Sequence, residues 1–404
     1  MCSASFVHTV LLRSDGSAVA TGRNRYGQCN IPPLDEGITY VQVSAGSFHT
    51  VLLRSDGSAV AVGENAVGQC DIPALDEGIA YNHVSAGGHR TVLLLSDGSA
   101  VAIGDNRCGQ CNIPPLDEGM AYTQISAGFG HTVLLRSDGR AVAIGDNAHG
   151  QCNIPALNEK IAYNQVSAGY AHTVLLRSDG SAVAIGDNQC GQCNIPPLVE
   201  GTAYTQISAG DAHTVLLRTD GSAVAVGENC SDIPALDEGM AYTQVSAGRY
   251  HTVLLRSDGS AVGIGGNRDG QCDIPLPEPG ICYVGDFSCG RDLVLQLELV
   301  GEDDAVTLIC STLVGKERIR LTVEGIDSAW ETHKRIAREL KMNLPSLQLV
   351  VPDGQLLAKV CRMNPGASVA EVKVLSTRPD IAAKLQLART GALVLTMFGG
   401  SNIT

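Results

Sequence analysis

Tryptophan, other aromatic residues and charged residues are scarce in this sequence. Its 404 residues include one Trp, and aromatic residues make up 4% and charged residues 17%. Such a low charged fraction beside 44% hydrophobic residues argues against general disorder and allows a sizeable core. No run approaches the roughly 18 apolar residues of a membrane-spanning helix. The first residues carry no basic region, so we expect no signal peptide and no membrane association.

Positive charge is also in short supply. The net charge is −14, and the part after residue 300 holds 11 acidic and 13 basic residues, so residues 1–300 carry 31 acidic and 15 basic residues, a balance of −16. An acidic domain repels phosphate backbones, which disfavours nucleic-acid binding. Without a secretory signal, the 14 cysteines are expected to be reduced thiols. We therefore expect a cytoplasmic protein, possibly a nuclear one.

Repetition is what the sequence has in abundance. The phrase His-Thr-Val-Leu-Leu or a close relative begins at His8, His49, Arg90, His131, His172, His213 and His251. Each step is 41 residues except the last, which is 38. A fixed period of this size indicates a repeat architecture.

One repeat predicts four short strands. The first resembles Tyr122–Ser126, and the second contains a continuous Val-Leu-Leu run that suits a strand buried on both faces. Ser-Asp-Gly then predicts a tight turn into a third strand rich in Val, Ile and Ala. A loop with Gly-Gln-Cys leads to a short Asn/Asp-Ile-Pro edge strand. Repeats of this size must stack on one another, and a closed ring removes their exposed ends.

Three motifs resemble the repeats of the regulator of chromosome condensation family. They are Ala-Gly-x-x-His-Thr (Ala45–Thr50), Ser-Asp-Gly (Ser55–Gly57) and Gly-x-Asn-x-x-Gly-Gln (Gly63–Gln69). The resemblance covers residues 1–299 and implies a mainly β fold, a seven-bladed β-propeller. Trp-Asp-repeat propellers have a similar period, but the only Trp, Trp330, lies outside the repeats. The first repeat lacks its opening strand, so we expect Ile281–Glu298 to complete the first blade.

A second domain is expected after a linker at 300–304. Ala305–Gly325 predicts two strands, Ser328–Met342 a helix with a capping box, and Leu347–Leu357 a hairpin. This order resembles a small α+β ubiquitin-like (β-grasp) domain over 305–400, with Ala392–Gly400 as its last strand and tail. Gly399 and Gly400 would form a conjugation tail only if residues 401–404 were removed, and we favour a flexible terminus.

Repeated polar residues are expected to be structural. Equivalent positions of a ring lie far apart, so the repeated histidines cannot share a metal, and hydrogen bonding is the better explanation. The Gly-Gln-Cys cysteines are interpreted as small buried hydrophobes. Cys108 with Cys111, and Cys190 with Cys193, have a spacing that can bind zinc or exchange disulfides, but the first position varies among the repeats. We expect no metal, no cofactor and no catalytic residue.

Differences between the repeats predict the binding site. They cluster in two loops, one before His-Thr and one before Gly-Gln, which leave a blade on the same face. The acidic turns, with the sequences Ser-Asp-Gly and Asp-Glu-Gly, lie on the opposite face. This variable face is expected to dock a protein partner. Relaxed drift in exposed loops is the alternative explanation of the variability. The expected contact residues are Tyr26, Phe48, Arg107, Phe129, Tyr170, Arg249 and Tyr250.

The predicted function is a non-enzymatic interaction scaffold. Its propeller would bind a protein, and residues 305–400 would dock on ubiquitin-pathway or proteasomal components. The resemblance also implies an alternative: a regulatory part of a HECT-type ubiquitin ligase system, or a guanine nucleotide exchange factor for a small GTPase. The repeats, however, carry no insertion such as the exchange factor uses, and no HECT-sized domain follows them.

Overall fold

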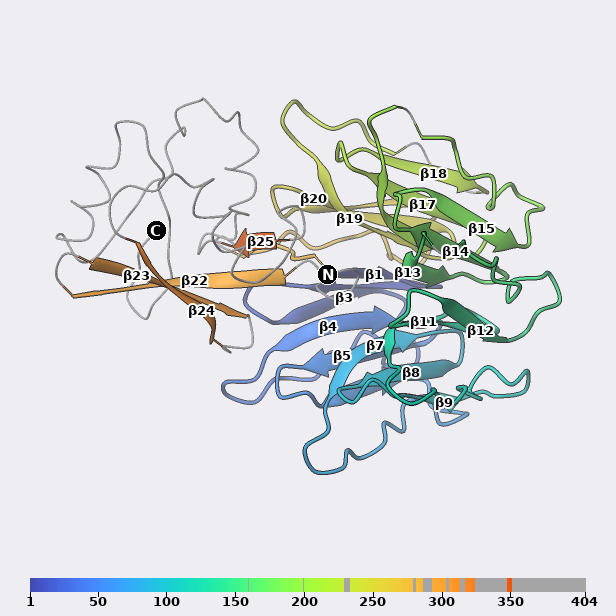
Figure 1. Ribbon diagram of the computed structural model, residues 1–404, viewed down its shortest axis with the longest axis horizontal. Helices are drawn as coiled ribbons and strands as arrows, with labels where there is room; N and C mark the ends of the chain where they lie inside the picture. The colour runs from blue at the N-terminus through green and yellow to red at the C-terminus, as the bar shows by residue number, and fades with distance from the viewer. Residues whose placement is uncertain are drawn as a thin grey trace. The chain divides into compact units, whose positions relative to one another are not determined.

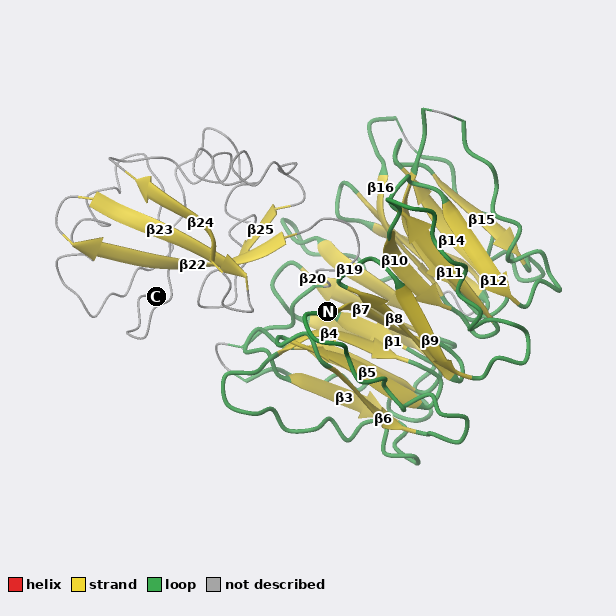
Figure 2. Cartoon of the chain, turned by 60° about the horizontal axis from the view of Figure 1, so that its bottom comes forward, coloured by secondary structure: helices red, strands yellow, loops and turns green. Residues whose placement is uncertain are grey.

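The computed structural model describes residues 1–158, 160–198, 200–228, 233–278 and 281–285, together with four strands between residues 293 and 350. The chain divides into two compact units, of which the first holds Met1–Pro277 and Tyr283–Cys289. The described residues form strands and loops (Figure 2). Among them, no helix is long and apolar enough to cross a membrane.

Seven antiparallel three-stranded sheets make up the first unit, one for each repeat, and follow one another along the chain (Figure 1). The sheets are β1–β3 (Cys2–Ala4, His8–Leu12, Ala18–Gly22), β4–β6 (Tyr40–Ala45, His49–Arg54, Ala59–Gly63), β7–β9 (Tyr81–Ala86, Arg90–Leu95, Ala100–Gly104), β10–β12 (Tyr122–Ala127, His131–Arg136, Ala141–Gly145), β13–β15 (Tyr163–Ala168, His172–Arg177, Ala182–Gly186), β16–β18 (Tyr204–Ala209, His213–Arg218, Ala223–Gly227) and β19–β21 (Tyr242–Ala247, His251–Arg256, Ala261–Gly265).

Among the described residues, the predicted fourth strand of the repeats is not formed. The Asn/Asp-Ile-Pro segments, such as Asn30–Pro32, join no sheet. Proline removes the backbone donors that a sheet ladder needs, so these segments pass irregularly along the sheets. They still contribute to packing, because the hydroxyl of Tyr40 donates a hydrogen bond to the Pro32 carbonyl at 2.9 Å. The same tyrosine–proline contact recurs in every repeat.

The core lies between neighbouring sheets. In one layer, Val51 of β5 packs with Tyr81 and Val84 of β7 and with Leu93 of β8. Equivalent layers join each later pair of sheets, and another joins the last sheet to the first. The continuous burial of Val-Leu-Leu follows from this stacking, because each central strand is covered on both faces.

A ring of serines connects the seven first strands. The backbone N–H of Ala86 donates to the Ser44 hydroxyl of the preceding sheet at 2.9 Å. The same 2.9 Å bond repeats at all seven junctions, including Ala4 to Ser246. The ring of sheets is thus closed by polar contacts as well as by apolar layers.

Both ends of the repeat region build the first sheet. Contrary to expectation, the first repeat has an opening strand of its own, β1, paired with β2. Tyr283 extends it by forming a bridge with Arg13, and Val284 donates its N–H to the Leu12 carbonyl at 3.1 Å. The carbonyl of Met1 accepts the N–H of Leu12 at 2.7 Å. Among the described residues of Ile281–Glu298, the backbone contribution to the first sheet is this short bridge.

The second unit contains a four-stranded sheet in the order β24-β23-β22-β25. Its strands are β22 (Leu293–Glu302), β23 (Ala305–Thr312), β24 (Glu317–Val323) and β25 (Leu347–Val350). The β23–β24 hairpin matches the expected strand pair. However, β22 pairs with β23 through Gly301 and Glu302, which were expected to lie in a linker. The expected helix, most of the second hairpin, the last strand and the Gly399-Gly400 tail lie outside the described residues, so the ubiquitin-like domain is not shown.

Candidate partner-binding site

Each sheet presents its two variable loops at the same edge. In the second sheet, His49 at the end of one loop pairs with Gly63 at the start of the other. Loops of neighbouring sheets also meet, because Tyr26 of the first sheet contacts Phe48 of the second with ring centroids 5.6 Å apart. The Ser-Asp-Gly turns lie at the opposite end of the same strands. In one of them Asp56 accepts the Ser58 N–H at 2.8 Å, and Gly57 has a φ of 83°, which favours glycine.

Buried histidines fix the strands below the variable loops. In each of them, Nε2 contacts a threonine hydroxyl of the next sheet at 2.8–3.0 Å. These histidines are His8, His49, His131, His172, His213 and His251. The Thr50 hydroxyl donates its one proton to the Gln28 carbonyl, so the N–H of this contact belongs to His8. The predicted hydrogen-bonding role of these histidines is confirmed.

Burial keeps these six histidines neutral. It lowers the pKa of His8, His49, His131 and His251 to about 3, and that of His172 and His213 to about 4. In all but His8, the Nδ1 atom is buried without a hydrogen-bond partner among the described residues. An added proton would therefore find no acceptor.

The third sheet replaces histidine with arginine. Arg90 is buried, and its Nε donates a hydrogen bond to the Thr132 hydroxyl at 3.0 Å. This nitrogen takes the place of the histidine Nε2 of the other repeats. The other nitrogens of Arg90 donate to the carbonyls of Phe129 and His131. Burial lowers the pKa of Arg90 to about 10, so the side chain remains charged. This substitution preserves the ring of contacts.

The cysteines are hydrogen bonded rather than simply hydrophobic. The thiols of half-buried Cys111 and Cys193 donate to backbone carbonyls at 3.2 Å. Burial raises the pKa of Cys193 to about 11, which opposes thiolate chemistry. Cys108 and Cys190 are exposed. In the described part of the chain, no three metal-binding side chains form a group.

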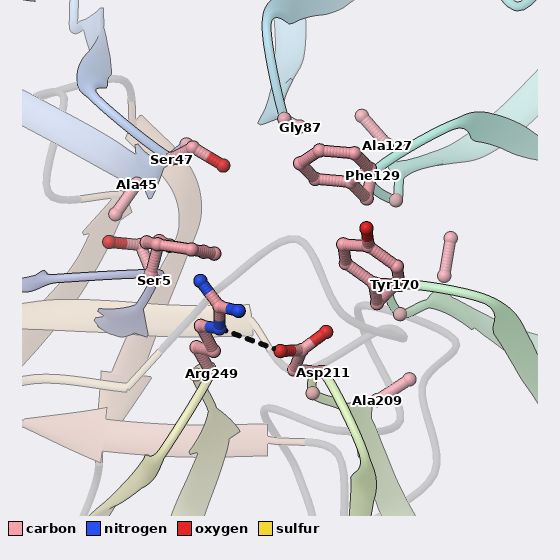
Figure 3. A pocket seen from close by; sticks show the side chains of 18 of the residues that line it. Ser5, Ala45, Ser47, Gly87, Ala127, Phe129, Tyr170, Ala209, Asp211 and Arg249 are labelled. Carbon is pink, nitrogen blue, oxygen red and sulfur yellow. Dashed lines mark ion pairs between the residues drawn. The ribbon is translucent and has the colours of Figure 1, made fainter. Parts of the chain in front are cut away.

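A cavity of about 120 Å³ opens where the seven sheets converge. Each sheet contributes the end of its first strand and the following loop. The lining differs between the sheets at one position, two residues before the central strand begins. The residues at this position are Phe6, Ser47, Gly88, Phe129, Tyr170, Asp211 and Arg249. Figure 3 shows Phe129, Tyr170, Asp211 and Arg249 around this opening.

Aromatic side chains form an arc around the cavity. Phe129 stacks on Tyr170 with centroids 4.3 Å apart, and His89 contacts Phe129 at 6.2 Å. Phe48 continues the arc by contacting His89 at 5.9 Å and Phe6 at 5.7 Å. Five consecutive sheets therefore share one surface, which we call the aromatic arc: Phe6, Phe48, His89, Phe129 and Tyr170.

An ion pair completes the circle. Arg249 Nε lies 2.9 Å from an Asp211 carboxylate oxygen (dashed in Figure 3), without the alignment of a hydrogen bond. The Arg249 guanidinium lies 3.7 Å from the Phe6 ring centroid and 4.6 Å from that of Tyr250. Burial raises the pKa of Asp211, and the charge of Arg249 opposes that shift.

Comparison with protein families identifies the repeats. Six segments match the Regulator of chromosome condensation (RCC1) repeat: residues 40–69, 82–110, 122–151, 163–192, 204–232 and 242–271. The chain contains RCC1 repeats within residues 40–271. No curated protein sequence matches it.

Solved structures share the fold of the RCC1 repeats. Prp20p from Saccharomyces cerevisiae has a TM-score of 0.55 at 18% identity, over 69% of this chain and 85% of its own. The ectodomain of the Arabidopsis thaliana receptor kinase ACR4 has a TM-score of 0.53 at 20% identity, over 69% and 100%. Human WBSCR16 has a TM-score of 0.53 at 16% identity, over 63% and 85%.

The RCC1 repeats bring together most of the predicted contact residues. Phe48, Phe129 and Tyr170 belong to the aromatic arc, Tyr26 touches it, and Tyr250 lies against Arg249. Arg107 instead points to the rim, where it pairs with Asp105 at 2.8 Å and is 81% exposed. Sequence reasoning did not select Phe6 or Asp211. Both occupy the loop position of Phe129, so comparing the repeats at that position would have found them.

Proposed function

We propose that this RCC1 propeller is a protein-binding scaffold whose variable face docks a partner. One observation carries the proposal. Among the described residues, six large apolar side chains are exposed, and five of them lie in the two variable loops: Tyr26, Val67, Phe129, Tyr170 and Tyr250. Exposed aromatic residues gathered on one face are typical of protein interfaces.

Two solved structures of one relative, yeast Prp20, support a protein as the ligand. Prp20p was studied for its binding to Gsp1p and histones, and yeast RCC1 (Prp20) was solved with Kap60 bound. These partners belong to that protein. For this chain they favour the class of partner, a protein, without indicating which one. Docking of residues 305–400 on ubiquitin-pathway components remains a prediction.

Replacing Phe129, Tyr170 and Tyr250 by alanine should reduce partner capture at least a hundredfold. Each removes an exposed aromatic anchor, and loss of an anchor typically costs about 2 kcal/mol or more. Affinity capture with the full chain, quantified by mass spectrometry, measures the effect.

The matched control for this capture experiment lies on the opposite face. Glu77, Glu118 and Glu238 are exposed in the acidic turns, and changing them to lysine should leave capture unchanged. The Ser-Asp-Gly aspartates are unsuitable controls because Asp56 and Asp179 hold their turns. Loss of capture in the glutamate variant alone would place the binding site on the acidic face.

We also propose that the chain lacks ligase and exchange activity. Its Gly-Gln-Cys thiols have raised pKa values, as at Cys70 and Cys152, which suits structural thiols better than nucleophiles. Incubation with ubiquitin-activating and ubiquitin-conjugating enzymes should yield no thioester adduct. Nucleotide release from small GTPases should not accelerate. A reducible ubiquitin adduct would support the ligase alternative, and faster release the exchange alternative.

A further inference from the structure

Arg249 is held in place at the edge of the cavity while much of its guanidinium stays uncommitted. Phe6 and Tyr250 lie against it, and Asp211 pairs with its Nε. Among the described residues, the carboxylate that pairs with this guanidinium does so through Nε rather than through the two terminal nitrogens. Figure 3 shows these nitrogens directed into the cavity, facing Phe129 and Tyr170. An arginine presented in this way can form two parallel hydrogen bonds to a carboxylate.

We propose that the cavity binds the carboxylate of an Asp or Glu side chain from an acidic segment of a protein partner. This inference rests on the proposed function and specifies the chemistry of the partner. The two terminal nitrogens of Arg249 donate to the carboxylate. The stacked rings of Phe129 and Tyr170 contact the apolar part of the segment.

The charges on the variable face favour an acidic segment over a basic one. Its exposed cations include Arg25 and Arg268, which project from the rim loops, whereas Arg107 is paired with Asp105. Several of its carboxylates are half-buried and already engaged. The Gln110 and Gln192 side chains, for example, donate to Asp105 and Asp187 at 3.4 and 3.1 Å.

The size of the cavity favours a side chain over a free ligand. Its volume of about 120 Å³ is below the roughly 300 Å³ at which small-molecule sites begin. The open aromatic surface around it suits a polypeptide that continues past the inserted side chain.

The test selects peptides from a random 12-residue phage-displayed library on the immobilised full-length protein. Enriched peptides are synthesised, and fluorescence anisotropy measures their affinity for four proteins: the native chain, Arg249→Met, Asp211→Asn and the opposite-face control Arg140→Met. We expect the enriched peptides to contain Asp or Glu. The chain's net charge of −14 makes non-specific attraction of such peptides improbable.

Arg249→Met and Asp211→Asn should act in opposite directions. Losing Arg249 should weaken binding at least tenfold, because two charge-assisted hydrogen bonds disappear. Losing the Asp211 charge removes the internal competitor for Arg249, so affinity should stay the same or rise. Arg140→Met should change affinity less than twofold. If Arg249 and Asp211 served only structure, both variants would weaken binding equally, and that result would overturn the inference. Arg249→Lys, which keeps the charge, and thermal melting separate loss of binding from loss of folding.

Failure of this inference is distinguishable from failure of the proposed function. Enriched peptides without acidic residues that are lost on Phe129→Ala would refute the carboxylate site and leave the docking face intact. Peptides insensitive to Phe129, Tyr170 and Arg249 substitutions would refute both. Recovery of no peptide at all would also count against the carboxylate site.

Discussion

Lowering the pH from 7 to 5 is expected to unfold the propeller. Six buried histidines have pKa values of about 3 or 4 in the folded protein, against 6.5 for an unperturbed side chain. Between these values the unfolded chain binds more protons, so stability is full above pH 6.5 and falls as the pH drops. Each histidine contributes roughly 1.4 kcal/mol per pH unit below 6.5, so the six together lose roughly 12 kcal/mol by pH 5. This loss is comparable to the roughly 5–15 kcal/mol that holds a domain folded.

Urea unfolding followed by circular dichroism at several pH values would measure this loss. His172→Gln should reduce the pH slope of the unfolding free energy by about one proton of six. His149→Gln is the matched control for the substitution itself, because His149 is exposed and its replacement leaves all six buried histidines in place. The aspartates with lowered pKa values, such as Asp97 and Asp220, act below pH 4 and do not interfere. Equal stability at pH 7 and pH 5 would contradict the prediction.

Replacing Tyr283-Val284 by Gly-Ser should lower the melting temperature by roughly 10–20 °C. The change removes a buried tyrosine, worth about 3–5 kcal/mol, and the bridge that closes the first sheet. Hydrogen exchange should then show selective loss of protection in β1–β3 and in the adjoining β19–β21, because opening exposes sheet edges.

The equivalent change in the fifth sheet provides the control. Tyr163, like Tyr283, donates a hydrogen bond to a proline carbonyl. Tyr163, however, lies in a strand whose pairing continues through Gln165, whereas Tyr283 forms an isolated bridge. Replacing Tyr163-Asn164 by Gly-Ser should destabilise the protein through the lost side chain without selective exposure of β1–β3. Identical exchange patterns in the two variants would show that the bridge does not close the ring.

The period and the turns of the repeats made much of the propeller predictable. Val-Leu-Leu marked the buried central strand, and the loop positions followed from strand alternation. Cys2–Ala4 was missed because its short Cys-Ser-Ala sequence lacks the Tyr that begins each of the other opening strands. The extra edge strand was a false prediction, because an Ile-Pro dipeptide cannot supply a ladder.

The contacts of the site were less accessible from sequence. Asp211 and Arg249 are 38 residues apart, and only stacking of neighbouring sheets makes them a pair. The aromatic arc likewise depends on whether each repeat places its ring at the first or second loop position, as Phe129 and Phe48 show. Whether these residues bind a partner remains a prediction.

Leu12 has a consequence for how the protein is made. It binds Met1 through its N–H and Val284 through its carbonyl, so one partner is synthesised shortly before it and the other long after it. At the roughly 5–20 residues per second of translation, the first sheet waits on the order of 14 seconds or more for its last partner. Throughout that interval the backbone groups of Leu12 and Arg13 that later bind Val284 and Tyr283 are open to any neighbouring chain, including a second nascent copy. Slow closure of this kind favours exchange of the terminal strand between molecules when expression is high, and makes dilute, chaperone-assisted synthesis the productive route.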